Sequence, residues 1–406
     1  MAEGIKAVVA YKRQTAKSVK PTATGATRLQ EFNTFSLNEQ VDVKTIDVMN
    51  ASQMRSDVVI NGNKVNGSMA GKLGPAMYFD FMKAALRQDN GFTATTGAIT
   101  TLSATSTTGA AGTLDISTGS FVSMGFMPGT SVRCTGFTTP ATANNSRNFY
   151  ILAVDAQSLS VVALDGEPIV AKAAGDTITC SMHGKCFAAL PENQVKPYFF
   201  FEKYHPDVIN TPSMQYLDCV IAGMDIDATA TDVPSISFTI MGLSADKKSV
   251  QYFTSPANTT DKGKFSKGLF YIAVDGQIAG CITSIKLSQK GNSDFGAVCM
   301  NSRNPSDIIN KTMDVTGSIT AVFDNDYWLE KSKTNEGISL FLVFKQDNTP
   351  ESEVLAIFMP TVILNNAKYD VKDGEIMIDA QFTSVMYNGV DPSIPKTVLM
   401  IQDTAA

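Results

Sequence analysis

The chain has 406 residues, of which 44% are hydrophobic and 18% charged, and its formal net charge is −6. This length favours two or three domains, and the hydrophobic fraction is that of a globular protein, which excludes a disordered chain. The acidic balance argues against a tight nucleic-acid binder, because such proteins carry a basic surplus that displaces counterions from phosphates.

The N-terminal segment, residues 1–31, is basic and poor in apolar residues. Up to residue 30 it holds six Lys or Arg against one acid, Glu3, and we expect an arm that is mobile by itself. It lacks the apolar core of a secretory signal, and no apolar run approaches the roughly 18 residues of a membrane span. We therefore expect a soluble intracellular chain. Its cysteines would then be reduced and packed as small hydrophobic residues: Cys134, Cys180, Cys186, Cys219, Cys281 and Cys299.

A strand-like stretch occurs twice. "SDVVINGNKVNGSM" at residues 56–69 recurs as "SDIINKTMDVTGSI" at 306–319, an offset of 250 (306 minus 56). Each copy continues into a segment with helical periodicity, at 72–88 and at 322–333. The second helix is expected to be capped by Asp324 or Asn325. The large apolar groups correspond, because Tyr78 aligns with Trp328 and Phe79 with Leu329.

Both copies then continue as strands. In the second copy a turn at 334–337 leads directly into a strand at 338–345, whereas in the first the matching strand begins only at Lys196. Residues 215–240 and 353–380 each have the pattern strand, polar turn, strand. The sequence therefore predicts a duplicated unit of strand, helix and three further strands.

An insertion interrupts the first copy between residues 91 and 187. It is rich in Gly and Thr, low in charge, and made of short alternating runs separated by turns, which is typical of a small all-β sandwich. We expect a domain that projects outward from a surface loop. The polar stretch 254–268 is expected to link the two copies.

Short motifs that could indicate a catalytic or cofactor site do not have the spacing that such sites require. His183 lies three residues before Cys186, but no second pair completes a zinc site. "GSMAGKL" at 67–73 lacks the spacing and the Ser/Thr of a phosphate-binding loop. The acids Asp225, Asp227 and Asp232 lack a calcium-binding pattern and are expected to be solvated loop residues. No nucleophile–base set is present, so we expect no enzyme, no metal and no cofactor.

The aromatic run "YFFFEKY" at 198–204 has two interpretations. It resembles a platform on which nucleic-acid bases stack, but no basic groove accompanies it. A strand buried on both faces is the favoured interpretation.

The chain resembles phage tail tube proteins of long, flexible, non-contractile tails. The resemblance rests on "VTGSITAVFDNDYWLEKSKTNEGISLFLVF" (315–344) and on the strands that follow it. "GTSVRCTGF" and "AAGDTITC" in the insertion resemble an Ig-like decoration of such proteins. The resemblance implies a mainly β fold with two tandem tube-type β-sandwich or barrel domains, each with one short helix, and an inserted Ig-like β-sandwich. The expected divisions are an arm (1–31), tube domain 1 (32–90 and 188–253), the insertion (91–187), a linker (254–268) and tube domain 2 (269–406).

The same resemblance implies a structural virion protein that is made in the bacterial host cytoplasm. In this family single tube domains form hexameric rings, and duplicated chains form trimeric, pseudo-hexameric rings that stack into a hollow tube. The expected partners are other copies of the chain, the tape measure protein, the tail terminator and the distal tail proteins. Phage double-stranded DNA would make transient, non-specific contact during ejection, and no membrane contact is expected.

Two sets of residues are candidates for this function. Alternation along the repeated strands predicts a polar face toward the lumen, formed by Asn66, Ser68, Thr316, Ser318 and Thr320. The helices predict packing or intersubunit contacts through Tyr78, Phe79, Tyr327, Trp328 and Leu329. The basic arm is expected to dock on a neighbouring ring.

Two alternatives to a tube subunit stay open. A cell-surface or carbohydrate-binding β-sandwich protein would use the insertion for recognition, although its aromatic residues lie mostly in strand-like runs. Another ring of the tail, such as the terminator or a baseplate hub component, would share the fold but would not stack without limit.

Overall fold

The computed structural model describes residues 7–46, 57–210, 212–259, 262–266, 270–278, 281–300, 302–322, 326–372 and 375–406. Strands dominate these residues, and the α-helices among them are α1 (Phe79–Ala85) and α2 (Tyr327–Thr334). The predicted mainly β class is confirmed. Within the described part of the chain, no helix is long and apolar enough to cross a membrane.

The repeat is longer than the sequence indicated, because seven strands and one helix recur in the same order. In the first copy, called domain 1, the elements are β1 (Val8–Arg13), β4 (Asn38–Ile46), β5 (Asp57–Lys72), α1, β13 (Phe199–Tyr204), β14 (Ser213–Thr229), β15 (Ser235–Gly242) and β16 (Ser244–Lys248). In the second copy, called domain 2, they are β18 (Phe270–Val274), β20 (Ile282–Lys290), β23 (Asp314–Val322), α2, β24 (Ile338–Lys345), β25 (Val354–Lys372), β26 (Glu375–Ser384) and β27 (Met400–Asp403).

Short strands complete the two domains. They are β2 (Thr27–Leu29), β3 (Thr34–Phe35), β17 (Ala257–Asn258), β19 (Gln277–Ile278), β21 (Asp294–Phe295) and β22 (Ile308–Ile309).

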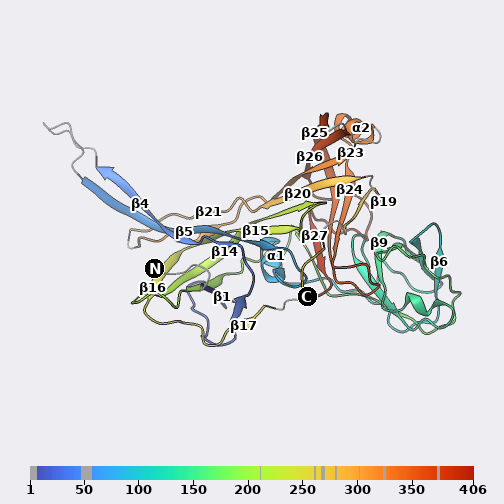
Figure 1. Ribbon diagram of the computed structural model, residues 1–406, viewed down its shortest axis with the longest axis horizontal. Helices are drawn as coiled ribbons and strands as arrows, with labels where there is room; N and C mark the ends of the chain where they lie inside the picture. The colour runs from blue at the N-terminus through green and yellow to red at the C-terminus, as the bar shows by residue number, and fades with distance from the viewer. Residues whose placement is uncertain are drawn as a thin grey trace.

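One inner sheet of eight strands runs through both domains (Figure 1). Its order is β4, β5, β15, β14, β20, β23, β26, β25, with β3 extending β4 at the edge of β5. All of these pairings are antiparallel. The domains meet where β14 pairs with β20, from Gly223 opposite Lys290 to Thr229 opposite Ser284. We call this pairing the internal seam.

Each domain also has an outer sheet, and its longest strand belongs to both sheets. The first part of β14 pairs with β13 and β16, and its second part pairs with β15 and β20 after a bulge near Ile221. In domain 2 the first part of β25 likewise pairs with β24 and β27, and its second part pairs with β26. The main hydrophobic core lies between the inner and outer sheets and continues from one domain into the other.

The basic segment is built into domain 1 rather than forming a separate arm over its described length. β1 pairs with β13 and with β2, and Val9 and Tyr11 are buried in the main core. The basic side chains are bound within the chain: Arg13 Nη1 lies 2.6 Å from Asp89 Oδ1, and Lys20 Nζ donates to Gln215 Oε1. Val9, Ala10 and Tyr11 are buried in succession, with Ala10 in a separate apolar cluster, so this short apolar run forms a strand covered on both faces, which the low apolar content of the whole segment concealed. Residues 1–6 lie outside the described residues.

The expected linker also packs against both domains. β17 pairs in parallel with β2, and Phe265 is fully buried in the main core. This stretch therefore joins the two copies as part of their packing.

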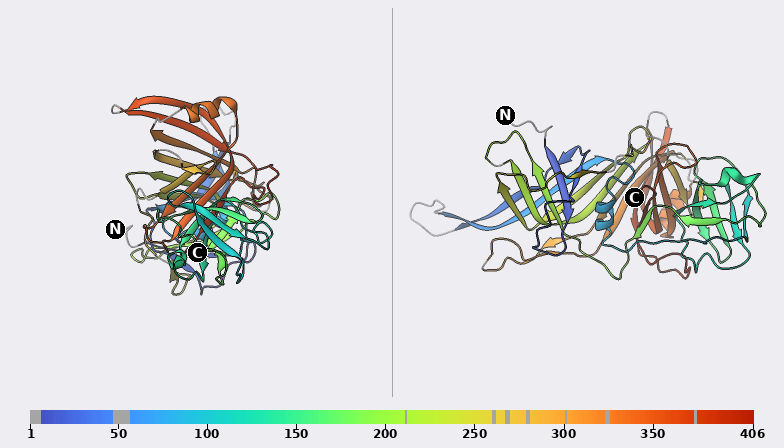
Figure 2. Two further views of the ribbon diagram at one scale, coloured as in Figure 1. Left: turned by 90° about the vertical axis from the view of Figure 1, so that its right-hand side faces the viewer. Right: turned by 90° about the horizontal axis from the view of Figure 1, so that it is seen from below.

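The insertion forms one six-stranded antiparallel sheet in the order β11 (Thr179–Met182), β8 (Ser131–Thr135), β9 (Asn148–Val154), β10 (Ser158–Ala163), β7 (Ala111–Ile116), β6 (Leu102–Ser106). It has its own core, and isolated bridges such as Ile99 to Ile178 link its edge segments. Figure 2 shows it at one end of the long axis, with the β4–β5 hairpin at the other end. Its Ig-like character stays a prediction.

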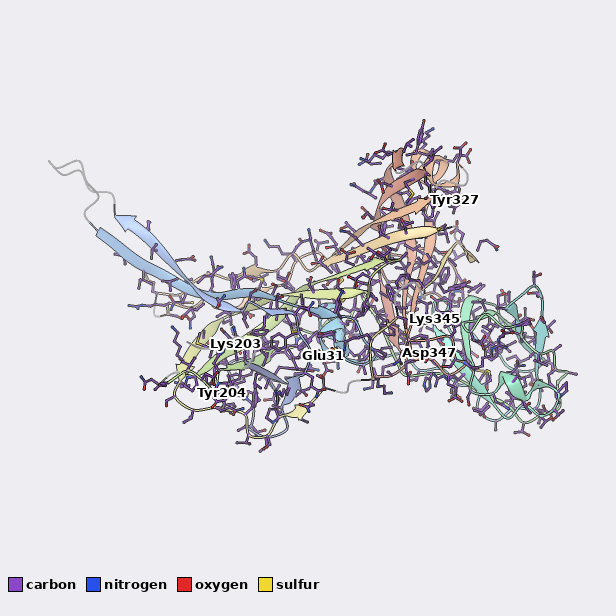
Figure 3. All side chains as sticks on the ribbon, in the orientation of Figure 1. Glu31, Lys203, Tyr204, Tyr327, Lys345 and Asp347 are labelled. Carbon is purple, nitrogen blue, oxygen red and sulfur yellow. A yellow bond between two sulfur atoms is a disulfide. The ribbon has the colours of Figure 1, made fainter. Side chains whose placement is uncertain are left out.

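The insertion does not simply project, because it packs on the outer sheet of domain 2. Its exit strand β12 (Lys185–Ala188) pairs with β27, and Tyr150 lies fully buried in a shared apolar cluster with Phe341 and Phe358. Lys345, which Figure 3 labels at this junction, donates to the carbonyl of Leu164 at 2.7 Å.

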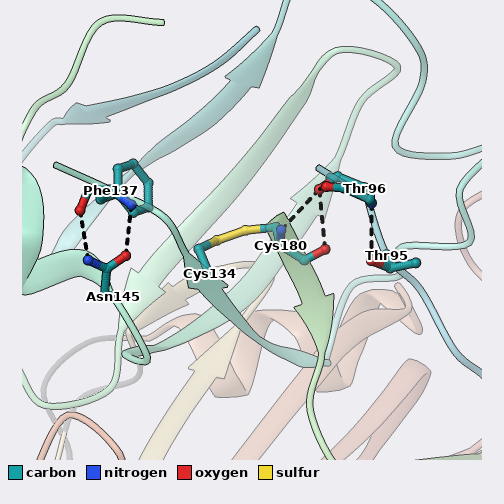
Figure 4. Close-up of a disulfide and its surroundings, with 7 residues drawn as sticks. Thr95, Thr96, Cys134, Phe137, Asn145 and Cys180 are labelled. Atoms are coloured by element: carbon teal, nitrogen blue, oxygen red, sulfur yellow. Dashed lines mark hydrogen bonds between the residues drawn. A yellow bond between two sulfur atoms is a disulfide. The ribbon is translucent and has the colours of Figure 1, made fainter. Parts of the chain in front are cut away.

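A disulfide joins Cys134 in β8 to Cys180 in β11, within the core of the insertion (Figure 4). The expectation that all six cysteines are reduced is therefore wrong for this pair, because antiparallel pairing sets the two residues directly opposite each other. Cys186 and Cys219 are free and buried, and Cys281 and Cys299 are free and exposed.

Candidate functional site: the polar face and edges of the inner sheet

The inner sheet has one apolar and one polar face. In β23, Val315 and Ile319 are buried in the main core, whereas the alternate residues Thr316, Ser318 and Thr320 are partly exposed. In β5, Val65 and Met69 take the buried positions. The period of two in both strands therefore sends small polar groups to the face opposite the core.

The structure places all five lumen candidates on this polar face. Asn66 and Ser68 lie in β5, and Ser68 Oγ is 3.1 Å from Ser36 Oγ in the next segment of the sheet. Thr320 Oγ1 donates to Asp379 Oδ1 at 2.7 Å. Thr316 and Ser318 line a shallow groove that runs across the internal seam. Their exposure fits the predicted role, and the lumen itself stays a prediction.

Charges of both signs are paired on this face. Lys286 Nζ lies 3.2 Å from Asp227 Oδ2 across the internal seam, and Lys72 Nζ lies 2.9 Å from Asp232 Oδ2. Ser288 Oγ donates to Asp225. Exposed pairs of this kind add little stability, but they neutralise charge locally. Asp225 and Asp227 thus lie in β14 rather than in a loop, because the turn begins only after Thr229.

The candidate helix residues are buried in domain 1 but mostly partly exposed in domain 2. Tyr78 and Phe79 are buried in the main core, where the Tyr78 hydroxyl donates to the carbonyl of Glu31 at 2.6 Å. In α2 only Trp328 is buried among the helix residues, while Tyr327 and Leu329 are partly exposed. Tyr327 lies at the upper end of domain 2 in Figure 3, where burial and a hydrogen bond to Asp275 raise the pKa of its hydroxyl. The helix begins after Asp326, and the predicted caps Asp324 and Asn325 lie outside the described residues.

The residues of the rejected catalytic, metal and base-stacking motifs have structural roles in the fold. Gly67 lies in β5, where an added Cβ would stand 2.6 Å from the Cα of Leu37, so this glycine permits close strand packing. The carbonyl of His183 accepts a hydrogen bond from Gln402, and burial raises the pKa of the Cys186 thiol. The run at 198–204 supplies β13, where Phe199, Phe200 and Phe201 are all buried, which confirms a strand covered on both faces.

The free edge of β25 is a feature that the sequence interpretation missed. On this edge Tyr369 and Val371 are 64% and 65% exposed. Tyr369 faces Ile378 as Ile226 faces Ile236 in domain 1, so the corresponding residues are Ile226 and Ala228, which are 3% and 2% exposed beside β20. Among the described residues no strand pairs with this side of β25 beyond Val362. The signal in the sequence was the alternation of apolar and polar residues in "AKYDVK", which belongs to the stretch "ILNNAKYDVKDGE" that was expected to form the polar turn within residues 353–380.

Comparison with known proteins agrees with this architecture. A family model described as phage tail tube protein matches residues 4–384. A search of curated proteins found no match. The match covers domain 1, the insertion within it and domain 2 up to the end of β26, so the chain belongs to the phage tail tube protein family and is a structural component of the phage tail.

Proposed function

We propose that three copies of this chain form a closed, pseudo-hexameric ring, that rings stack into the tail tube, and that phage DNA passes through its lumen. The observation that carries the proposal is the internal seam, where two homologous four-stranded units already form one continuous inner sheet. A chain with two such units supplies two of the six positions in a ring of sixfold appearance.

The dimensions of such a ring suit a channel. Three copies of the eight-stranded inner sheet give 24 strands (3 × 8). At about 4.8 Å per strand the barrel diameter is about 37 Å for untilted strands and about 48 Å at the usual tilt of about 40°. This width leaves room for a DNA duplex.

The polar face supplies the chemistry expected of a lumen. Small hydroxyl and amide groups such as Ser318, together with locally paired charges such as Lys286 with Asp227, offer no concentrated positive field to phosphates. In this proposal the tape measure protein fills the lumen before ejection, and the terminator and distal tail proteins cap the two ends of the tube.

Electron microscopy of the purified protein, with mass measurement of its smallest assembled species, tests the proposal. Hollow tubes built from rings of trimeric mass support it. A chain that remains monomeric at high concentration contradicts it and moves the function toward surface binding. Single rings of trimeric mass that never stack move it toward a terminator.

A further inference from the structure

A small pocket lies in domain 1 between α1, the end of β1 and the start of β13. Its volume is about 160 Å³. Tyr11 and Phe199, whose rings belong to the main hydrophobic core, form its apolar wall, and Gly25 and Thr27 line the opposite side. At about 30 Å³ for each water molecule, this volume equals about five waters. The pocket therefore suits one small unit of a ligand.

Three cationic side chains line this pocket: Lys12, Arg13 and Lys83. Two hydrogen bonds of 2.6 Å to Asp89 hold the Arg13 guanidinium in place, and Lys83 Nζ lies 3.8 Å from the same carboxylate. Lys12 Nζ donates to the carbonyl of Thr24 at 2.6 Å, which is a neutral acceptor. The cations are thus fixed in position, and they share one acid among them.

The pocket also has an exposed carboxylate and a buried hydroxyl. Asp80 of α1 lines it, and the Tyr11 hydroxyl donates to Asp80 Oδ2 at 3.3 Å. Tyr11 is only 5% exposed, and burial raises the pKa of its hydroxyl, so this group stays a donor. The three cations against Asp80 and Asp89 leave one positive charge (3 minus 2). The site is therefore suited to a ligand with one negative charge and with hydroxyl groups.

Domain 2 has the corresponding strand with a different charge. The pairing of β1 with β13, and of β18 with β24, aligns Tyr11 with Val274. Lys12 therefore corresponds to Asp275, whose carboxylate accepts a hydrogen bond from Tyr327 at 2.9 Å. Because domain 2 builds the same fold with the opposite charge, the fold does not require a cation at Lys12.

The pocket lies on the side of domain 1 away from the polar face of the inner sheet. β1 and α1 pack in the main core, which covers the apolar face of that sheet. Figure 1 shows both elements beneath β5 and β15. In the proposed ring the polar face lines the lumen, so the pocket faces the medium outside the tube.

We propose that this pocket binds a uronic acid unit of an acidic polysaccharide. The sugar carboxylate lies among Lys12, Arg13 and Lys83, where hydrogen bonds between charged groups are strong. A sugar hydroxyl donates to Asp80, and the apolar face of the sugar ring packs on the wall at Phe199. A neutral sugar would leave the positive charge uncompensated, and a phosphate ion would leave the apolar wall unused.

Further units of the polysaccharide meet another cation beside the pocket. Arg28 follows the pocket-lining Thr27 in β2, opposite Ala10 of β1, and it is exposed. Each added uronate carries one more negative charge. Affinity is therefore expected to rise with the length of the oligosaccharide, and the outside of the tail would hold a polymer more firmly than a single sugar.

Isothermal titration calorimetry of the full chain with tetragalacturonate tests the proposal. Binding is expected at low salt and should weaken as salt increases. Lys12→Met with Lys83→Met is expected to weaken it about tenfold or more, because two of the three cations are lost. The matched control, Lys247→Met with Lys248→Met, removes two exposed lysines from β16 of the same domain and should leave the affinity within about twofold.

A footprint on the unchanged protein gives a second test that does not depend on the folding of a variant. Acetylation of lysines, read by mass spectrometry, is expected to slow several-fold at Lys12 and Lys83 when tetragalacturonate is present. The rates at Lys247 and Lys248 should stay the same. Equal protection of all four lysines indicates diffuse attraction and overturns the proposal, as does equal weakening by the two double variants.

Competing ligands test the chemical class of the occupant. Maltotetraose, which is similar in size but uncharged, should not bind. If maltotetraose binds as well as tetragalacturonate, or if inorganic phosphate displaces tetragalacturonate at equal concentration, the site does not select a uronic acid.

The same measurements separate this inference from the proposed function. Binding to the dilute single chain does not require a ring, so its absence overturns the inference alone. Binding to the single chain that is lost in assembled tubes overturns the placement of the site on the outside of the tube.

Discussion

Domains 1 and 2 share one architecture but differ in how completely they are covered. α1 buries five side chains, whereas in α2 only Trp328 is buried. Ile226 lies covered at the internal seam, and its counterpart Tyr369 is exposed. Domain 1 has a homologous neighbour and domain 2 lacks one within the chain. The same strand position is thus buried where a second copy of the repeat pairs beside it, and exposed where, among the described residues, no strand does.

The outer sheets of the two domains are both covered, but by different parts of the chain. In domain 2 the insertion covers the outer sheet, and buried Gln402 donates to the carbonyls of Ser131 and His183. In domain 1 the segment around Phe253 covers it, held by backbone hydrogen bonds to buried Glu202. One fold thus accepts two different covers on its outer face, while the inner sheet is kept the same.

The largest loss of stability is expected at two equivalent glycines, Gly67 in domain 1 and Gly317 in domain 2. An added Cβ would lie 2.6 Å from the Cα of Leu37 at Gly67, and 2.2 Å from the carbonyl oxygen of Lys286 at Gly317. Gly67→Val and Gly317→Val are therefore each expected to reduce the free energy of unfolding by about 3 to 5 kcal/mol, or to abolish soluble protein. Urea unfolding followed by circular dichroism measures this.

The control for these glycines is Ser318→Ala, on the opposite face next to Gly317, with an expected change within about 0.5 kcal/mol. If the valine variants unfold at the same urea concentration as the control, the two domains do not depend on close strand approach.

A second prediction compares the two edges directly. Ile226→Ser is expected to lower the free energy of unfolding of the monomer by about 3 kcal/mol, because the side chain is buried. Tyr369→Ser should cost less than about 1 kcal/mol in the monomer, yet should prevent or weaken assembly. Unfolding of dilute protein and sedimentation at high concentration separate the two effects. Equal losses in the monomer would contradict the view that the β25 edge is an assembly surface.

The sequence predicted the features that local pattern and repetition determine. These include the strand at 338–345, the strand–turn–strand segments and the alternation that places Thr316 and Ser318 on a polar face. It did not predict the internal seam, because pairing between β14 and β20 depends on contacts between strands far apart in the chain. The disulfide was not predicted for a related reason. The register that sets Cys134 opposite Cys180 cannot be deduced from the number of residues between them.

A third prediction concerns the residues just before α1, which form a hydrogen bond with Asp403 of domain 2. The Ala76 N–H donates to Asp403 Oδ2 at 2.7 Å, and burial raises the pKa of Asp403 to about 6. The folded state therefore keeps this proton at a pH where the unfolded chain has lost it. Stability from this group falls as pH rises from about 4 to 6, by up to about 3 kcal/mol.

Asp403→Asn should remove that slope, because an amide does not titrate and its oxygen still accepts one backbone hydrogen bond. Thermal unfolding of both proteins between pH 4 and 7 measures the difference. A variant whose melting temperature follows the wild-type pH profile throughout would show that Asp403 ionises in the folded state as it does in the unfolded chain.

The smallest effect on folding and the most specific effect on function is expected on the polar face. Asn66 and Thr316 occupy corresponding positions of the two domains and are partly exposed. Replacing both with Lys adds one positive charge per domain at equivalent places. Tubes should still form, since neither side chain is in the core, but duplex DNA should now bind inside them at low salt and ejection should slow.

Asn66→Gln with Thr316→Gln is the matched control, because it adds length without charge. Sedimentation of assembled tubes with duplex DNA, repeated as salt increases, measures binding. Retention of DNA by the lysine tubes alone, lost at high salt, is the result expected of a lumen lined equally by both domains. If lysine tubes and glutamine tubes retain DNA equally, this polar face does not line the channel, and the correspondence between the domains serves assembly rather than passage.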